Sequence, residues 1–168
     1  MKIIILAAGM GSRMKQDKPK CACLIKNKPM INYLLDTCSK LKYDEIIIVV
    51  GYKKEEIKDV IKMNVTYIEQ PKQLGTADAL KCCYDYLKDY NGELLIIPGD
   101  TPLIELETLD NFIKAHNKQK NKLTILSTYM SNPNSFGRIK KANGQVIKII
   151  EESELTDIDK NIKETNTG

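Results

Sequence analysis

Short apolar runs alternate with stretches of helical periodicity along most of the chain. The runs are mostly aliphatic, and such runs are typical of strands buried on both faces of a parallel sheet. They span residues 3–6, 45–50, 65–68, 94–97 and 123–129. Between them, apolar residues recur with the 3.6-residue period of an amphipathic helix over residues 31–41, 53–62 and 80–87, and more weakly around Phe112. The pattern predicts an α/β fold, a three-layer α/β/α sandwich with a mostly parallel sheet.

The pattern changes near the end of the sequence. Residues 138–149 carry Asn143-Gly144 between two strand-like arms. Asn-Gly readily adopts the positive φ angles of a two-residue hairpin turn, so we predict a β-hairpin here. Gly137 and Glu151 flank the hairpin, where a ligand that lies across the sheet edge could reach them. The alternative interpretation of Glu151 is a solvated strand end.

Three loops should meet at one edge of the predicted parallel sheet. They follow the first, third and fourth strands, at residues 7–13, 69–76 and 99–102, and they are rich in glycine, small polar and charged residues. Ligands of parallel α/β sheets bind at the carboxyl ends of the strands. The coincidence of these loops therefore indicates a binding site more strongly than any one of them.

The loop after the first strand has the parts needed to hold a nucleoside triphosphate. Its small residues Ala7, Ala8 and Gly9 let a ligand approach the backbone, and their amide N–H groups can point at an anion. Arg13 and Lys20 add two positive charges. The spacing is neither that of a Walker A loop nor that of a dinucleotide-binding loop. The competing interpretation is a plain strand-to-helix turn with Arg13 and Lys20 as surface charges.

The other two loops offer groups for a base and for a metal ion. Gln70 carries a donor and an acceptor that can read a base edge, and Gly75-Thr76 offers free backbone N–H groups at a helix start. The alternative is that Thr76 is an N-cap and Gln70 is solvated. Gly99-Asp100 places a carboxylate where it could hold Mg²⁺ on phosphates. Taken alone, Asp100 is better explained as a residue that caps a turn.

Composition and charge exclude several other classes of function. The net charge is +4 and the lysines are scattered, so we expect solvated helix faces and no nucleic-acid surface. The five cysteines form no CxxC pair and there is one histidine, which argues against a zinc site and favours reduced thiols in the cytoplasm. The first apolar run is too short for a signal peptide or a membrane span.

Together these segments resemble the sugar-nucleotide pyrophosphorylases, nucleotidyltransferases with an L-x-x-G-x-G-[ST]-R-M signature followed by P-K. Within this family they are most similar to the uridylyltransferase domain of the bifunctional enzymes that make UDP-N-acetylglucosamine. The matching segments follow the family's order and spacing over essentially the whole chain. They are residues 6–14 with 19–20, then 73–77, 99–104, 137–139 and 164–168.

The resemblance implies a Rossmann-like nucleotide-diphospho-sugar transferase fold, in a single nucleotidyltransferase domain over residues 1–168. It implies transfer of UMP from UTP to N-acetylglucosamine 1-phosphate, with Mg²⁺ as cofactor. By position, Arg13, Lys20 and Asp100 would be the catalytic residues, with Asp100 as the metal ligand. The substrate-binding residues would be Leu6, Ala7, Ala8, Gly9, Lys20, Gln70, Gly75, Thr76, Gly99, Asp100, Gly137, Glu151 and Asn166.

The chain departs from the family pattern at Ala22-Cys23, at Asp78 and at Pro98, without losing a charge that the chemistry needs. In the family, the domain continues beyond the Asn-Thr-Gly segment to a second Mg²⁺ ligand, and a β-helix acetyltransferase domain follows. We therefore expect a domain that is incomplete at its C-terminus. Two alternatives stay open: a nucleotide-binding domain without turnover, and a related enzyme that uses another nucleoside triphosphate. A strand edge left unpaired would favour homo-oligomers.

Overall fold

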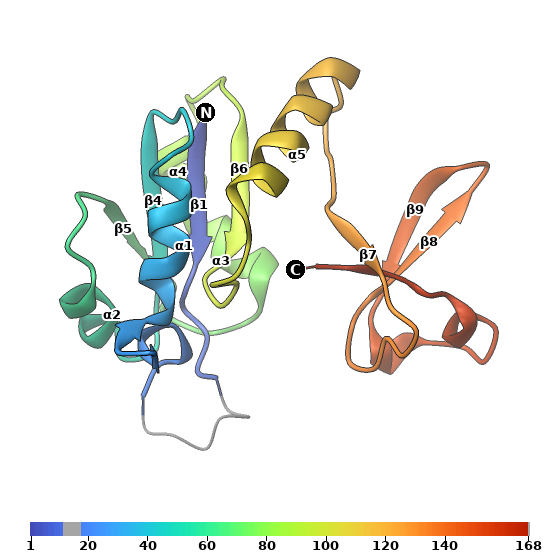
Figure 1. Ribbon diagram of the computed structural model, residues 1–168, viewed down its shortest axis with the longest axis horizontal. Helices are drawn as coiled ribbons and strands as arrows, with labels where there is room; N and C mark the ends of the chain where they lie inside the picture. The colour runs from blue at the N-terminus through green and yellow to red at the C-terminus, as the bar shows by residue number, and fades with distance from the viewer. Residues whose placement is uncertain (12–17, 168) are drawn as a thin grey trace. The chain divides into compact units, whose positions relative to one another are not determined.

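The computed structural model describes residues 1–11 and 18–167 (Figure 1). The chain divides into two compact units, Met1–Asp110 and Asn111–Gly168, and each is described here by itself. The expectation of a single nucleotidyltransferase domain over residues 1–168 stays a prediction. Within the described residues, no helix is both long enough and apolar enough to cross a membrane.

The first unit is built on a parallel four-stranded sheet. Its strands are β1 (Lys2–Leu6), β4 (Glu45–Val50), β5 (Thr66–Glu69) and β6 (Leu94–Pro98), in the order β5-β4-β1-β6. In the register, Ile4 lies opposite Ile47 of β4 and Ile96 of β6. β1 and β4 are almost wholly buried, as their aliphatic sequences predict. β6 at the sheet edge instead alternates between exposed and buried residues.

Helices lie on both faces of this sheet. They are α1 (Met30–Cys38), α2 (Lys54–Val60), α3 (Thr76–Cys82) and α4 (Tyr84–Leu87). In Figure 1, α1 crosses in front of the sheet, whereas α3 and α4 lie behind it. α1 follows Pro29 directly and buries Ile31, Leu34, Leu35 and Cys38 on one face, which confirms the predicted period. The predicted helix over 80–87 is divided at Cys83 into α3 and α4.

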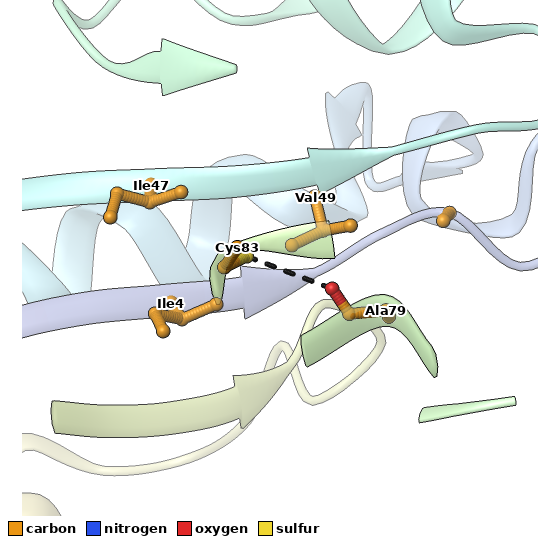
Figure 2. Packing of buried hydrophobic residues seen from close by; sticks show 6 residues of the cluster. Ile4, Ile47, Val49, Ala79 and Cys83 are labelled. Carbon is orange, nitrogen blue, oxygen red and sulfur yellow. Dashed lines mark hydrogen bonds between the residues drawn. The ribbon is translucent and has the colours of Figure 1, made fainter. Parts of the chain in front are cut away.

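A cluster of buried hydrophobic residues in the first unit fills the space between the sheet and α3. Ile4, Ile47 and Val49 point from the strands towards Ala79 and Cys83 (Figure 2). The Cys83 thiol donates a hydrogen bond to the carbonyl oxygen of Ala79, with an Sγ–O distance of 3.6 Å. Each of these side chains is at most 4% exposed, so this cluster fixes where α3 begins relative to the strand ends.

Short elements connect the sheet to its surroundings. A 3₁₀ helix, η2 (Lys20–Ala22), precedes a small hairpin of β2 (Leu24–Ile25) and β3 (Lys28–Pro29). The boundary between the two units falls inside α5 (Leu106–Gln119), which is the helix that the sequence predicts around Phe112.

The second unit carries an antiparallel sheet. Its strands are β7 (Ser127–Tyr129), β8 (Arg138–Ala142), β9 (Gln145–Ile150) and β10 (Glu164–Asn166), in the order β7-β10-β8-β9. Two 3₁₀ helices, η3 (Glu152–Glu154) and η4 (Asp159–Asn161), connect β9 to β10. The predicted hairpin is confirmed, because Asn143 and Gly144 turn from β8 to β9 with φ angles of 50° and 78°.

The strand that the sequence predicts at residues 123–129 is shorter in the structure and belongs to a different sheet. Only Ser127–Tyr129 is extended, and this strand pairs antiparallel with β10 instead of joining the parallel sheet. β10 itself is polar and has no apolar alternation, so it gave no strand signal. Its partners β7 and β8 supply hydrogen bonds on both sides, and this tertiary pairing makes the segment a strand.

Candidate functional site at the carboxyl ends of the parallel strands

The loop after β1 lies against the ends of β4 and β6. The amide of Ala7 donates to the Val49 carbonyl at 2.9 Å, and the amide of Gly99 donates to the Leu6 carbonyl at 2.8 Å. Ala7 and Ala8 are buried, whereas Gly9 is exposed. The structure therefore brings the first and third predicted loops together, and the chain turns outward at Gly9.

Gly99 is a closely packed point of this edge. A Cβ atom on Gly99 would lie 2.9 Å from the Leu6 carbonyl oxygen, 3.0 Å from Cys21 Sγ and 3.3 Å from Ala7 Cβ. No side chain fits there without a shift of the β1 backbone. A glycine is thus required for the loops after β1 and β6 to pack this closely.

Lys20 and Asp100 form an ion pair across this edge. Lys20 Nζ lies 2.5 Å from Asp100 Oδ2, and the two side chains are 38% and 37% exposed. Lys20 begins η2, and Asp100 follows β6 by two residues. The turn after β6 is closed by Thr101, whose hydroxyl donates to the Pro98 carbonyl at 2.7 Å. Asp100 therefore directs its carboxylate at the Lys20 ammonium, not into the turn.

Cys21 follows Lys20 in η2 and is buried. Burial raises the pKa of its thiol to about 12, and the Asp100 carboxylate adds to the rise while the Lys20 ammonium opposes it. The thiol therefore stays protonated at neutral pH and is a poor nucleophile. The reactive groups exposed at this place are the ammonium and the carboxylate.

Gln70 lies at the end of β5 and is only 3% exposed. Its backbone amide donates to the Val50 carbonyl at 2.8 Å. Its side-chain Nε2 donates to the Gly75 carbonyl at 3.1 Å and to Asp78 Oδ2 at 2.8 Å. The alternative that Gln70 is solvated is therefore wrong, and the sequence gave no sign that Asp78 would be its partner.

Gly75 and Thr76 stand at the start of α3, as expected. Gly75 is the N-cap residue with a φ of 105°, and no side chain caps the helix there. Thr76 is the first helical residue, so the alternative that Thr76 is the N-cap does not describe this helix start. Both residues are exposed.

A hollow of about 430 Å³ borders the same edge at the start of α2; its lining residues are Gly51, Lys53, Lys54, Glu55, Glu56 and Glu69. Lys54 Nζ pairs with Glu69 at 2.6 Å across it. A Cβ atom on Gly51 would lie 3.0 Å from both Ala8 Cβ and the Gln70 carbonyl oxygen. The hollow thus adjoins the Ala8 loop, but Lys20 and Asp100 do not line it.

The remaining predicted residues lie in the second unit or outside the described residues. Gly137 and Asn166 meet there, because a Cβ on Gly137 would lie 2.6 Å from Asn166 Oδ1 and the Asn166 amide donates to the Gly137 carbonyl at 3.2 Å. Asn166 Oδ1 is buried without a hydrogen-bond partner. Glu151 is exposed after β9. Arg13 lies outside the described residues.

The residues at this edge fit a magnesium ion that arrives with phosphates. Among the described residues, no group of three or more His, Cys, Asp or Glu side chains could bind a metal ion on its own. Mg²⁺ needs no such group, since it commonly takes one or two carboxylates and completes its shell with phosphate oxygens and water. Asp100 supplies one carboxylate, next to an ammonium that can pair with a phosphate.

The sequence profile described as nucleotidyl transferase matches residues 2–160 of the chain. Among curated relatives, the bifunctional protein GlmU of Thermoanaerobacter pseudethanolicus is 42% identical over 166 residues, which are 98% of this chain and 36% of that protein. The GlmU of Fervidobacterium nodosum is 41% identical over 169 residues, 100% of this chain and 36% of that protein. The chain thus spans little more than a third of the length of these relatives.

Two solved structures have folds similar to that of this chain. A crystal structure named "Putative Glucose-1-Phosphate Thymidylyltransferase" from Bacillus anthracis superimposes with a TM-score of 0.76 at 25% identity, over 99% of this chain and 69% of that chain. The manganese complex of Rv0371C from Mycobacterium tuberculosis gives a TM-score of 0.58 at 15% identity, over 70% of this chain and 59% of that chain. At that identity, the second likeness shows the fold alone.

Proposed function

The chain belongs to the nucleotidyl transferase family, and from this premise we propose that it transfers UMP from UTP to N-acetylglucosamine 1-phosphate, giving UDP-N-acetylglucosamine and pyrophosphate. The identity of about 40% to bifunctional GlmU proteins supports these substrates. The Lys20–Asp100 ion pair, beside the small-residue loop at the carboxyl ends of β1 and β6, is the observation that carries the proposal.

In the proposed reaction, a phosphate oxygen of the sugar phosphate attacks the α-phosphorus of UTP in line. A new P–O bond forms, and the bond between the α-phosphorus and the bridging oxygen breaks, so that pyrophosphate leaves with both electrons of that bond. The attacking phosphate is already anionic, and no general base is needed. Such reactions depend on positioning and on charge neutralisation.

The residues of this chain have separate tasks in the proposal. The Lys20 ammonium exchanges its partner Asp100 for the triphosphate, and Arg13 neutralises the leaving pyrophosphate. Asp100 would hold Mg²⁺, which supplies charge neutralisation on the phosphates. The backbone of residues 6–9 with Gly99 holds the nucleoside, with Gln70, Gly75 and Thr76 at the base. Gly137, Glu151 and Asn166 of the second unit hold the amino sugar.

The test is a pyrophosphate-release assay with UTP and N-acetylglucosamine 1-phosphate at varied Mg²⁺ concentration. Asp100→Asn should raise the Mg²⁺ concentration for half-maximal rate by about tenfold or more, which corresponds to ~1.4 kcal/mol of lost metal binding. Asp85→Asn, on the exposed surface of α4, is the matched control and should behave as wild type. An unchanged Mg²⁺ titration in Asp100→Asn would contradict the metal-binding role.

Calorimetric titration with UTP and Mg²⁺ separates turnover from binding alone. The second candidate is a nucleotide-binding domain without turnover. UTP binding without pyrophosphate release would establish that candidate. Release of pyrophosphate that requires both substrates would establish the transferase.

A further inference from the structure

We propose that Asp78 is a positioning residue, which fixes the side-chain amide of Gln70 so that its carbonyl oxygen is presented to the base. The site then takes pyrimidine nucleotides that carry an N–H at position 3, namely uracil or thymine, and rejects cytosine. This inference rests on the proposed nucleotide site. It concerns a residue at which the chain departs from the family pattern.

The contacts of Gln70 occupy both donors of its side chain. A glutamine amide has two N–H groups on Nε2 and one carbonyl oxygen, Oε1. Nε2 donates to the Gly75 carbonyl at 3.1 Å and to Asp78 Oδ2 at 2.8 Å. Oε1 is therefore the polar atom of this side chain that these two contacts leave available to a ligand.

These two partners determine the orientation of the amide. A backbone carbonyl and a carboxylate are both acceptors only. A flipped amide would place Oε1 against two oxygen atoms and lose both hydrogen bonds, so the network fixes which end is nitrogen. Asp78 is half-buried on the first turn of α3, and its carboxylate therefore acts as a fixed partner and not as a freely moving surface charge.

Gln70 is held beside the loop that is proposed to bind the nucleoside. Its backbone amide is tied to β4 through Val50 at 2.8 Å, and Gln73 Nε2 donates to its carbonyl at 3.1 Å. At Gly51, an added Cβ would lie 3.0 Å from both Ala8 Cβ and the Gln70 carbonyl oxygen. The backbone of Gln70 is thus held at both its N–H and its carbonyl, and the same Gly51 position borders both this carbonyl and Ala8.

A fixed acceptor distinguishes pyrimidines by the atom at position 3. Uracil and thymine present an N–H there, which can donate to Oε1, whereas neutral cytosine presents a lone pair. Two acceptors then face each other, and a buried acceptor left without a donor is costly. Without Asp78, the Gly75 carbonyl is the one Nε2 partner left among the described residues, so the amide can rotate and offer its NH₂ group to cytosine.

The experiment measures the dissociation constants of UTP, dTTP and CTP, with Mg²⁺, for the full chain and for its variants. The wild type should bind UTP and dTTP more tightly than CTP by roughly tenfold or more. Asp78→Ala should bring the ratio of CTP to UTP dissociation constants close to one. Asp78→Asn should restore the preference, because its amide oxygen can still accept from Nε2. Asp85→Ala on α4 is the control and should leave the ratio unchanged.

The outcomes separate this inference from the proposed function. Tight UTP binding with the same ratio in wild type and Asp78→Ala would overturn the role of Asp78 and leave the proposed function intact. A wild type that prefers CTP would overturn the inference as well. A wild type that binds none of the three nucleotides would overturn the proposed function.

A second readout needs no nucleotide. In ¹H–¹⁵N spectra of the unliganded chain, both side-chain amide protons of Gln70 should exchange slowly with water. They should become fast in Asp78→Ala and remain slow in Asp78→Asn. Equal exchange in wild type and Asp78→Ala would overturn the inference even without nucleotide binding. If Asp78→Ala does not fold, Asp78→Ser, whose hydroxyl is too short to replace the carboxylate, gives the same comparison.

Discussion

At the scale of single residues, the edge of the parallel sheet depends on close contacts and charge pairs between loops that are distant in the sequence. Lys20 and Asp100 are 80 residues apart and yet in contact, and Gly99 next to Asp100 brings the loop after β6 against β1. The absence of a side chain at Gly99 thus has a direct consequence for the position of the Asp100 carboxylate.

We predict that Gly99→Ala destabilises the first unit by about 1–3 kcal/mol, because its methyl group must displace the Leu6 carbonyl and the Cys21 thiol. Urea unfolding followed by circular dichroism measures this change. Gly9→Ala is the matched control: a Cβ there meets nothing within 4 Å, so stability should change by less than about 1 kcal/mol. Equal stability of the two variants would show that the close packing at Gly99 relaxes without cost.

At the scale of elements, the buried side chain of Glu164 adds polar contacts that link β10 to β7 and β8. Ser127 and Tyr129 of β7 donate to the Glu164 carboxylate at 2.7 and 3.1 Å, and Lys141 of β8 lies 2.6 Å from it. Glu164 is 8% exposed. The hydrogen bond from Lys141 is the largest cause that lowers the pKa of Glu164, followed by the bond from Ser127.

This network predicts a pH dependence of stability with a definite sign. The pKa of Glu164 is lowered from its usual 4.5 in the folded chain, so the ionised carboxylate stabilises the fold above about pH 4.5. The contribution is lost as the pH falls from there through the lowered folded pKa. Glu164→Gln should cost roughly 1–3 kcal/mol at pH 7, and the difference from wild type should shrink towards pH 3 in urea unfolding.

The control for this prediction is Glu154→Gln. Glu154 pairs with Lys148 at 2.9 Å, but both side chains are more than half exposed, 55% and 58%. Exposed pairs contribute about 0–1 kcal/mol, so this variant should be nearly neutral at every pH. A Glu164→Gln deficit that persists unchanged at pH 3 would contradict the role of the ionised carboxylate.

At the scale of the whole molecule, the two compact units differ in their chemistry. All five cysteines lie in the first unit, as free thiols, and the second unit has none. Cys21, Cys23, Cys38 and Cys83 are buried and Cys82 is half-buried. Burial raises the pKa of Cys21 and Cys38 to about 12 and that of Cys83 to about 11. Thiol reactivity therefore reports the opening of the first unit alone.

We predict that a chromogenic disulfide reagent modifies Cys82 rapidly in the native chain, and the four buried cysteines only as the first unit unfolds. A thiolate is the reactive form, so burial and a raised pKa both slow the reaction. Cys82→Ser should remove the rapid phase and leave the slow phase unchanged. If more than one cysteine per chain reacts in the rapid phase, the core around α1 or η2 opens more easily than its burial implies.

Local patterns in the sequence determined much of this protein. The aliphatic runs identified the four parallel strands, the 3.6-residue period identified α1 and α5, and Asn143-Gly144 identified the hairpin. In each case the signal lies within a few neighbouring residues. The rule that ligands bind at the carboxyl ends of parallel strands also predicted that the loops with Gln70 and Asp100 lie at one edge of the sheet.

Only the tertiary structure decided which of these residues touch. Polar β10 becomes a strand because β7 and β8 provide partners, and Asp78 meets Gln70 because α3 packs on the sheet through Ala79 and Cys83. Such contacts depend on the register and packing of elements far apart in sequence, and no local pattern encodes them. The types of residue at the site thus follow from the sequence, whereas the pairing that orients Gln70 follows from the fold.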